Sequence, residues 1–203
     1  MSRARATAKI NLALVVGPRR ADGKHEVATV LQRIDLAALD PPPTKLVANL
    51  PYNVATPILV ESLDGLPSVG HWTVMVQREV ADRFFATPST KAYGAVSVLV
   101  QLVAEKTGFH PVSRTAFRPQ PNVESALVAF TRTGLPPAYP DVKRVVEAAF
   151  AHRRKTLPNS LELSGLASRP RAVDALAAIG REPDVRAEAL EPREFVALAE
   201  AFP

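Results

Sequence analysis

The apolar residues of the chain come in short runs, each with the length of one strand or of a short helix. Two runs near the N-terminus flank the turn signal Asp22-Gly23 and predict a β-hairpin, with strands at 8–16 and 27–36. Apolar runs bounded by turn residues predict further strands, at 46–50, 72–77, 109–117 and 124–132. Apolar residues at helical spacing predict helices between these strands, at 56–63, 78–86 and 93–105.

The run 46–50 is short and apolar, and we expect a strand that is covered on both faces. Thr56 and Pro57 follow it, and this pair suits the N-cap and the first position of the next helix. Before this run, three consecutive prolines exclude a helix interior or a central strand. Residues 40–45 are therefore expected to form a stiff surface connector.

From Pro140 onward the pattern is helical only, and helices are expected at 141–154, 171–179 and 192–202. Short turns that contain glycine or proline separate these stretches. The chain thus divides into an α/β portion, about 45–132, and a smaller helical portion, about 138–203.

The composition of the 203 residues is that of an ordinary globular protein, with 47% hydrophobic and 22% charged residues. The chain has no cysteine and only four scattered histidines, so we expect neither a disulfide nor a metal site. No apolar run reaches membrane-spanning length, and no membrane association is expected. The net charge of +5 lies mostly within residues 1–37, which limits its value as an indication of RNA binding.

The spacing of the nine glycines excludes two kinds of phosphate or cofactor loop. No two glycines are separated by a single residue, so a dinucleotide or S-adenosylmethionine loop of the GxG type is absent from residues 1–203. The GxxxxGK[ST] pattern of a P-loop is absent as well.

The tetrapeptide Asn49-Leu50-Pro51-Tyr52 follows the apolar run and has residue types suited to methylation of an adenine amine. The N6 lone pair of adenine is delocalised, and two oxygen acceptors that hold both N6 hydrogens would localise it. The Asn49 side chain and the Leu50 carbonyl are candidates, because Pro51 restricts the backbone of Leu50. Tyr52 offers a face for base stacking. The alternative interpretation is a strand-to-helix turn with a capping asparagine and a buried tyrosine.

Four segments in order, "LVANLPYNVATPIL", "VMVQREVADRFFATPSTKAYGAVSVLVQ", "FRPQPNVESALV" and "AFAHRRKTLPNSL", closely resemble the 16S rRNA adenine N6,N6-dimethyltransferase family. The resemblance runs from about Asp35 to the C-terminus. It implies a Rossmann-like methyltransferase domain followed by a small helical domain. It also implies S-adenosyl-L-methionine as the methyl donor and a pair of adjacent adenines in small-subunit (16S) rRNA, within the 30S particle, as the substrate.

The resemblance also assigns site residues. Asn49 would contact the target amine and the donor, and Tyr52 would stack on the adenine, whose other face Phe117 would cover. Candidate rRNA contacts are cationic side chains, namely Arg114, Arg118, Arg153, Arg154 and Lys155. The last three follow a predicted helix, and the alternative is that these cations only stabilise its C-terminus.

Residues 6–36 depart from the dimethyltransferase pattern and resemble instead the N-terminus of 4-diphosphocytidyl-methylerythritol kinase. Lys9, Asn11 and His25 match substrate-site positions of that family, whereas its ATP loop is missing. The alternative is a hairpin with a purely structural role. We also expect such a hairpin to cover an open edge of the sheet.

The expected fold class is therefore α/β, with an incomplete Rossmann-like methyltransferase domain and a small C-terminal helical domain preceded by a hairpin-like segment. The expected boundaries are 1–36, 37–134 and 135–203. The sequence indicates a cytoplasmic, S-adenosylmethionine-dependent rRNA adenine dimethyltransferase that is poorly active alone, because the donor loop is missing. A non-catalytic rRNA-binding module and a fragment of the isoprenoid kinase are the alternatives.

Overall fold

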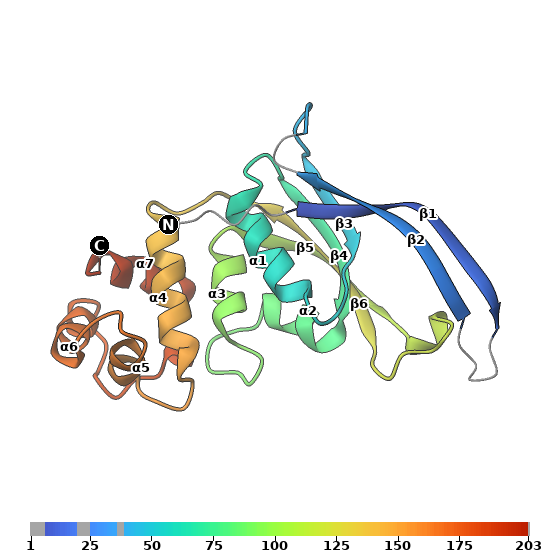
Figure 1. Cartoon of the computed structure of the whole chain (residues 1–203). Coiled ribbons are helices and arrows are strands. Elements are labelled where there is room, and N and C mark those ends of the chain that lie inside the picture. The colour runs from blue at the N-terminus through green and yellow to red at the C-terminus, as the bar shows by residue number, and fades with distance from the viewer. Residues whose placement is uncertain (1–6, 20–24, 36–38, 203) are drawn as a thin grey trace.

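A computed structural model describes residues 7–19, 25–35 and 39–202 of the chain. Figure 1 shows a long hairpin at one side, a sheet with helices in the middle and a group of helices at the other side. This order of a hairpin, an α/β part and a helical part agrees with the order expected from the sequence.

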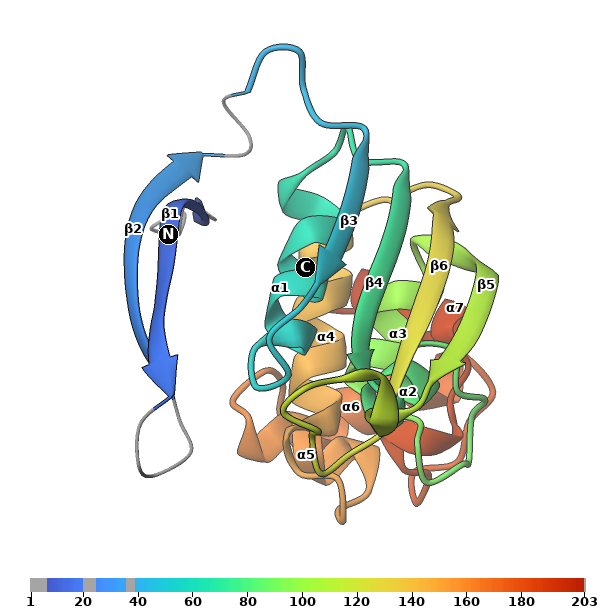
Figure 2. The same cartoon turned by 90° about the vertical axis from the view of Figure 1, so that its right-hand side faces the viewer.

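The hairpin consists of β1 (Thr7–Arg19) and β2 (His25–Asp35), which pair antiparallel from Thr7 opposite Asp35 to Arg19 opposite His25. The expected hairpin is confirmed, while its predicted turn at Asp22-Gly23 lies outside the described residues. The two strands form a sheet of their own that stands apart from the main sheet (Figure 2). The expectation that the hairpin covers an open sheet edge is therefore wrong, since neither of its strands pairs with the main sheet.

The main sheet has four strands in the order β3-β4-β6-β5. Their bounds are β3 Lys45–Asn49, β4 His71–Gln77, β5 Ala104–Val112 and β6 Ser125–Arg132. β3 and β4 are parallel, whereas β4 with β6 and β5 with β6 are antiparallel. Three helices cover one face of this sheet, namely α1 (Ala55–Gly65), α2 (Arg78–Phe84) and α3 (Ala95–Gln101).

Alternate residues of the central strands point into the core beneath these helices, which is the pattern of a sheet with one covered face. The buried side chains are Trp72, Val74 and Val76 of β4 and Ala126, Val128 and Phe130 of β6. Figure 2 looks onto the opposite, open face. There Val47 of β3 is 76% exposed, and Leu127 of β6 is 36% exposed. The expectation that 46–50 is covered on both faces is thus wrong, because β3 is the edge strand of a sheet with helices on one side.

Two helix boundaries also differ from expectation. α1 begins at Ala55, with Val54 as its N-cap and no side-chain capping bond, so Thr56 lies within the first turn. The helix starts two residues earlier than expected because the chain already turns at Pro51–Val54, where the Val54 N–H donates to the Pro51 carbonyl at 3.1 Å. The helix expected at 93–105 is shorter, since α3 ends at Gln101 and β5 already begins at Ala104.

The helical part contains four α-helices, α4 (Tyr139–Ala151), α5 (Leu157–Leu163), α6 (Arg169–Ala178) and α7 (Pro192–Glu200). The three expected helices are confirmed, and α5 is an addition whose seven residues are too few to show a helical period. A short 3-10 turn, η3 (Ala187–Ala189), precedes α7. The largest fully buried side chains of this part are Leu157, Leu161, Leu176, Leu190, Leu198 and Phe195.

Arg132, the last residue of β6, connects that strand to the end of α1. Its guanidinium donates to the carbonyls of Val69 at 2.7 Å, Leu63 at 2.9 Å and Leu66 at 3.2 Å. The same group lies 4.9 Å from the centroid of the buried Trp72 ring. Arg132 thus satisfies the carbonyls of Leu63 and Val69, which have no other donor among the described residues, and shares the Leu66 carbonyl with the Val69 N–H.

We predict that Arg132→Met lowers the free energy of unfolding by about 2–4 kcal/mol, because the apolar substitute leaves the carbonyls of Leu63 and Val69 without a donor. Urea unfolding followed by Trp72 fluorescence measures the change. Arg193→Met is the matched control: the Arg193 side chain is 86% exposed, and its loss is expected to change stability by less than about 0.5 kcal/mol. Equal effects of the two substitutions would contradict this role of Arg132.

Candidate functional site

The tetrapeptide Asn49-Leu50-Pro51-Tyr52 lies at the carboxyl end of β3, where the parallel β3–β4 pair stops. Asn49 is the last residue of β3 and pairs with Met75. The Leu50 N–H then donates to the Met75 carbonyl at 3.0 Å, which continues the pairing by one residue. The tetrapeptide therefore occupies the strand end at which open α/β sheets bind ligands.

Two oxygen acceptors of this connection are available to a ligand. Within the described part of the chain, neither the Asn49 side-chain amide nor the Leu50 carbonyl takes part in an intramolecular hydrogen bond. Asn49 is exposed, whereas the Leu50 side chain is buried in the core and holds the backbone in place. These two groups are the candidate acceptors that we expect, from the sequence, for the two hydrogens of an exocyclic amine.

Tyr52 is half-buried, and its hydroxyl is hydrogen bonded to the Ser125 hydroxyl at 2.5 Å. Ser125 is the first residue of β6 and is fully buried. Sequence reasoning did not single out Ser125. The only signal in the sequence that could have indicated Ser125 is its place as a polar residue at the start of an expected strand, next to a connecting loop.

Phe117 lies in the connection between β5 and β6, which reaches the same end of the sheet as the tetrapeptide (Figure 2). This connection is closed on itself because the Arg114 backbone N–H donates to the Glu124 carboxylate at 2.9 Å. Phe117 is half-buried, and Arg118 beside it is exposed. The fold thus brings Tyr52 and the loop of Phe117 to one end of the sheet.

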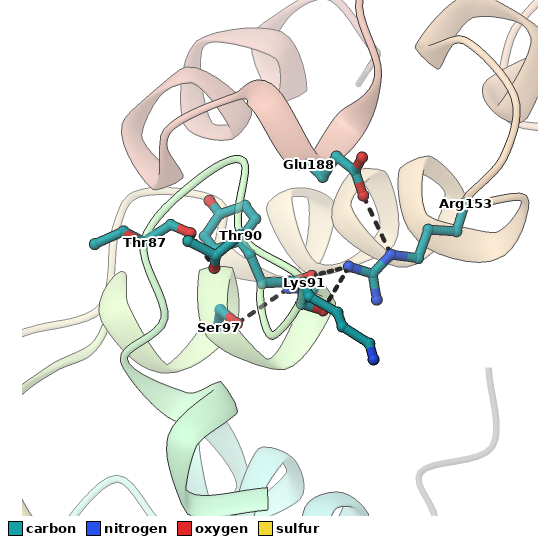
Figure 3. Close-up of polar contacts among 8 residues, drawn as sticks. Thr87, Thr90, Lys91, Ser97, Arg153 and Glu188 are labelled. Atoms are coloured by element: carbon teal, nitrogen blue, oxygen red, sulfur yellow. Dashed lines mark hydrogen bonds and ion pairs between the residues drawn. The ribbon is translucent and has the colours of Figure 1, made fainter. Parts of the chain in front are cut away.

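The three cationic residues that follow α4 have different environments. Figure 3 shows the Arg153 side chain crossing to the loop that precedes α3. Its Nη2 donates to the carbonyls of Tyr93 at 2.7 Å and Lys91 at 3.0 Å, and its Nε donates to the Glu188 carboxylate at 3.3 Å. Arg154 and Lys155 are exposed, and neither forms an ion pair within residues 39–202. Arg153 therefore joins the two parts of the fold, while its neighbours are free to bind an anion.

An open cavity of about 560 Å³ lies between the start of α2, the loop before α3 and the last residues before β6. Its arginines are neutralised, since Arg78 pairs with Asp82 at 3.6 Å and Arg83 pairs with Glu79. Lys91 also lines the cavity and is exposed, and no pattern in the sequence distinguished it.

The kinase-like residues do not come together in the hairpin. Lys9 pairs with Arg33 near the open end, whereas His25 pairs with Arg19 near the turn. Ten residues of extended strand between positions 9 and 19 correspond to roughly 30 Å. Asn11 lies near Lys9 on β1. The hairpin by itself therefore provides no shared site for these three residues.

No helix among the described residues combines the length and the apolar character needed to cross a membrane. In the same part of the chain, no group of three or more His, Cys, Asp or Glu side chains lies close enough to hold a metal ion.

The fold defines a class, that of the Rossmann-like methyltransferases, to which two solved structures are similar. A dimethyladenosine transferase from Plasmodium falciparum has a similar fold, with a TM-score of 0.68 over 80% of this chain and 68% of that chain, at 20% identity. The 23S rRNA methyltransferase ErmE is also similar, with a TM-score of 0.55 over 83% of this chain and 69% of that chain, at 25% identity.

The family model for ribosomal RNA adenine dimethylase matches residues 32–199, and the chain belongs to this family. A ribosomal RNA small subunit methyltransferase A from Rubrobacter xylanophilus is 46% identical over 184 residues, which cover 90% of this chain and 68% of that protein. The protein of the same name from Thermobifida fusca is 47% identical, over 81% of this chain and 58% of its own length. The chain thus spans about three-fifths to two-thirds of these relatives. The kinase resemblance of residues 6–36, mostly outside the family match, stays a prediction.

We predict that Arg153→Met lowers the free energy of unfolding by about 1–3 kcal/mol, because the carbonyls of Tyr93 and Lys91 lose a charged donor. Chemical unfolding of the whole chain measures the change. Arg154→Met is the matched control, since Arg154 is exposed and has no ion-pair partner among residues 39–202, and a change under about 0.5 kcal/mol is expected there. A stability loss for Arg154→Met equal to that for Arg153→Met would refute the assignment.

Proposed function

We propose that this chain provides the target-adenine and rRNA-binding part of an S-adenosylmethionine-dependent rRNA adenine-N6,N6-dimethyltransferase that acts on small-subunit (16S) rRNA. One observation carries the proposal: two unengaged oxygen acceptors and a tyrosine ring meet at the carboxyl end of β3. Membership of the ribosomal RNA adenine dimethylase family and the names of the relatives support the substrate class. Such a substrate implies action in the cytoplasm, on the 30S particle or its rRNA.

The chemistry of the site begins with the target amine. The Asn49 oxygen and the Leu50 carbonyl each accept one N6 hydrogen of adenine, which draws the nitrogen toward a tetrahedral geometry and localises its lone pair. Tyr52 stacks on one face of the base, and Phe117 covers the other face. The target base has to be unpaired or extruded to enter, because these groups contact its edge and both faces.

When bound, S-adenosylmethionine supplies a methyl group that is activated by its sulfonium. Of the described residues, Asn49 is the one that we assign to this donor, and residues 1–203 contain no GxG loop. The described residues therefore fit S-adenosylmethionine only in part, and no methyl-transfer step is assigned to them. A non-catalytic rRNA-binding module remains the second candidate function. The exposed Arg154 and Lys155, which have no ion-pair partner within residues 39–202, support this function and the enzyme equally.

We predict that the chain binds a small-subunit rRNA hairpin with two adjacent loop adenines more tightly than the same hairpin with two uridines. Tyr52→Ala is expected to lower only the affinity for the adenine hairpin, by about 1–3 kcal/mol, because base stacking is lost. Fluorescence anisotropy with labelled RNA measures both affinities. Equal affinity of the wild-type chain for the two hairpins would exclude adenine recognition.

The control for electrostatic contacts is Arg154→Ala. Loss of this side chain is expected to weaken the binding of both hairpins equally. It is also expected to lower the slope of log K against log salt by about 1. This result separates contacts to phosphate from contacts to the base.

We predict that a polypeptide of residues 1–203 binds S-adenosylmethionine weakly and transfers little methyl to rRNA, because it lacks the expected GxG loop. Calorimetric titration of the donor and a tritiated-methyl assay measure the two properties. Micromolar donor binding would overturn this prediction. RNA binding without turnover supports the binding module over the enzyme. ATP titration tests the kinase alternative, which predicts binding.

A further inference from the structure

Ser125 is a buried polar residue at the start of β6, the strand that lies between β4 and β5. It pairs with Gln77 of β4 on one side and with Val112 of β5 on the other, so its backbone is held from both sides. Its side chain is polar and 0% exposed. Within the described residues its hydroxyl has one hydrogen-bond partner, the Tyr52 hydroxyl at 2.5 Å. A buried hydroxyl generally has a partner, and here the partner comes from 73 residues earlier in the chain.

This hydrogen bond restrains the Tyr52 ring at its far end. The near end of the ring is attached to the connection between β3 and α1, whose course is set by the Leu50 N–H to Met75 carbonyl bond. A side chain held at both ends loses most of its rotational freedom before a ligand arrives. A stacking platform that is ordered in advance binds a base at a lower entropic cost.

Glu124, the neighbour of Ser125, restrains the loop that carries Phe117. Its carboxylate accepts from the Arg114 backbone N–H at 2.9 Å and lies 3.9 Å from the Arg114 Nε. Its own carbonyl accepts from the Arg78 N–H at 2.9 Å, which joins this point of the chain to the start of α2. Two adjacent residues thus anchor both segments that carry the aromatic rings.

We propose that Glu124 and Ser125 are positioning residues that set the separation of the Tyr52 ring and the Phe117 loop, and with it how fully the target adenine stacks between them. The proposal rests on the function proposed above, in which these rings cover the two faces of adenine. Ser125 contributes more to this positioning than Glu124 does, because its hydrogen bond is buried. Glu124 is half-exposed, so its contact with Arg114 is weakened by solvent.

The test measures adenine preference, the ratio of affinities for the adenine hairpin and the uridine hairpin, in the whole chain. Ser125→Ala and Tyr52→Phe each remove the hydrogen bond and keep the ring, and each is expected to lower the preference roughly 3- to 10-fold. The double variant is expected to lose no more than either single variant, because the same interaction is removed. Ser125→Thr keeps a hydroxyl and is expected to retain the preference.

Ser160→Ala is the matched control. Ser160 is also 0% exposed, but it lies in the helical part and its hydroxyl donates to the Ala148 carbonyl. It is expected to leave the adenine preference unchanged. Affinity for the uridine hairpin should stay within about 2-fold in every variant, since contacts to phosphate are unaffected.

Three outcomes would overturn the proposal. A wild-type preference in Ser125→Ala, together with its loss in Tyr52→Ala, refutes the positioning role and leaves the proposed function intact. An equal loss of affinity for both hairpins in Ser125→Ala indicates that Ser125 has a purely structural role. Absence of adenine preference in the wild-type chain rejects the proposed function, and the positioning role with it.

Discussion

The parallel pairing of β3 with β4 is the constraint on which the candidate site depends. It places Asn49 beside Met75, and one further bond, from the Leu50 N–H to the Met75 carbonyl, carries the chain to the end of the sheet before it turns. The Leu50 carbonyl accepts no hydrogen bond from the described residues and is therefore left for a ligand. A one-residue shift of this pairing would move Asn49 to the opposite face and separate the two acceptors.

Charged donors that satisfy backbone carbonyls stabilise two places in the fold. Arg132 does this at the end of α1, within the α/β part, and Arg153 does it at the loop before α3, across the junction with the helical part. A guanidinium suits this task because it offers several donors in one plane and remains charged. The consequence for RNA binding is that the basic cluster after α4 is divided. Arg153 is used within the fold, and Arg154 and Lys155 face solvent.

The hairpin of β1 and β2 and the main sheet are separate structures in one chain. Both carry exposed strand edges, and β3 has no strand partner on its outer side among the described residues. An edge strand with an exposed valine is a site for strand addition, whether from another part of a chain or from another molecule. The main sheet also has one face without helices, which distinguishes it from a sheet with helices on both sides.

The order of strands and helices and the place of the tetrapeptide after a strand were predictable, because they depend on local hydrophobic spacing and on proline. What only the tertiary structure decided was which distant segments meet. The exposure of Val47, the carbonyl partners of Arg153 about 60 residues away and the bond from Ser125 to Tyr52 across 73 residues all follow from packing. Local patterns specify which face of an element is apolar, but not which element covers that face, and this choice assigns each polar side chain to binding or to the fold.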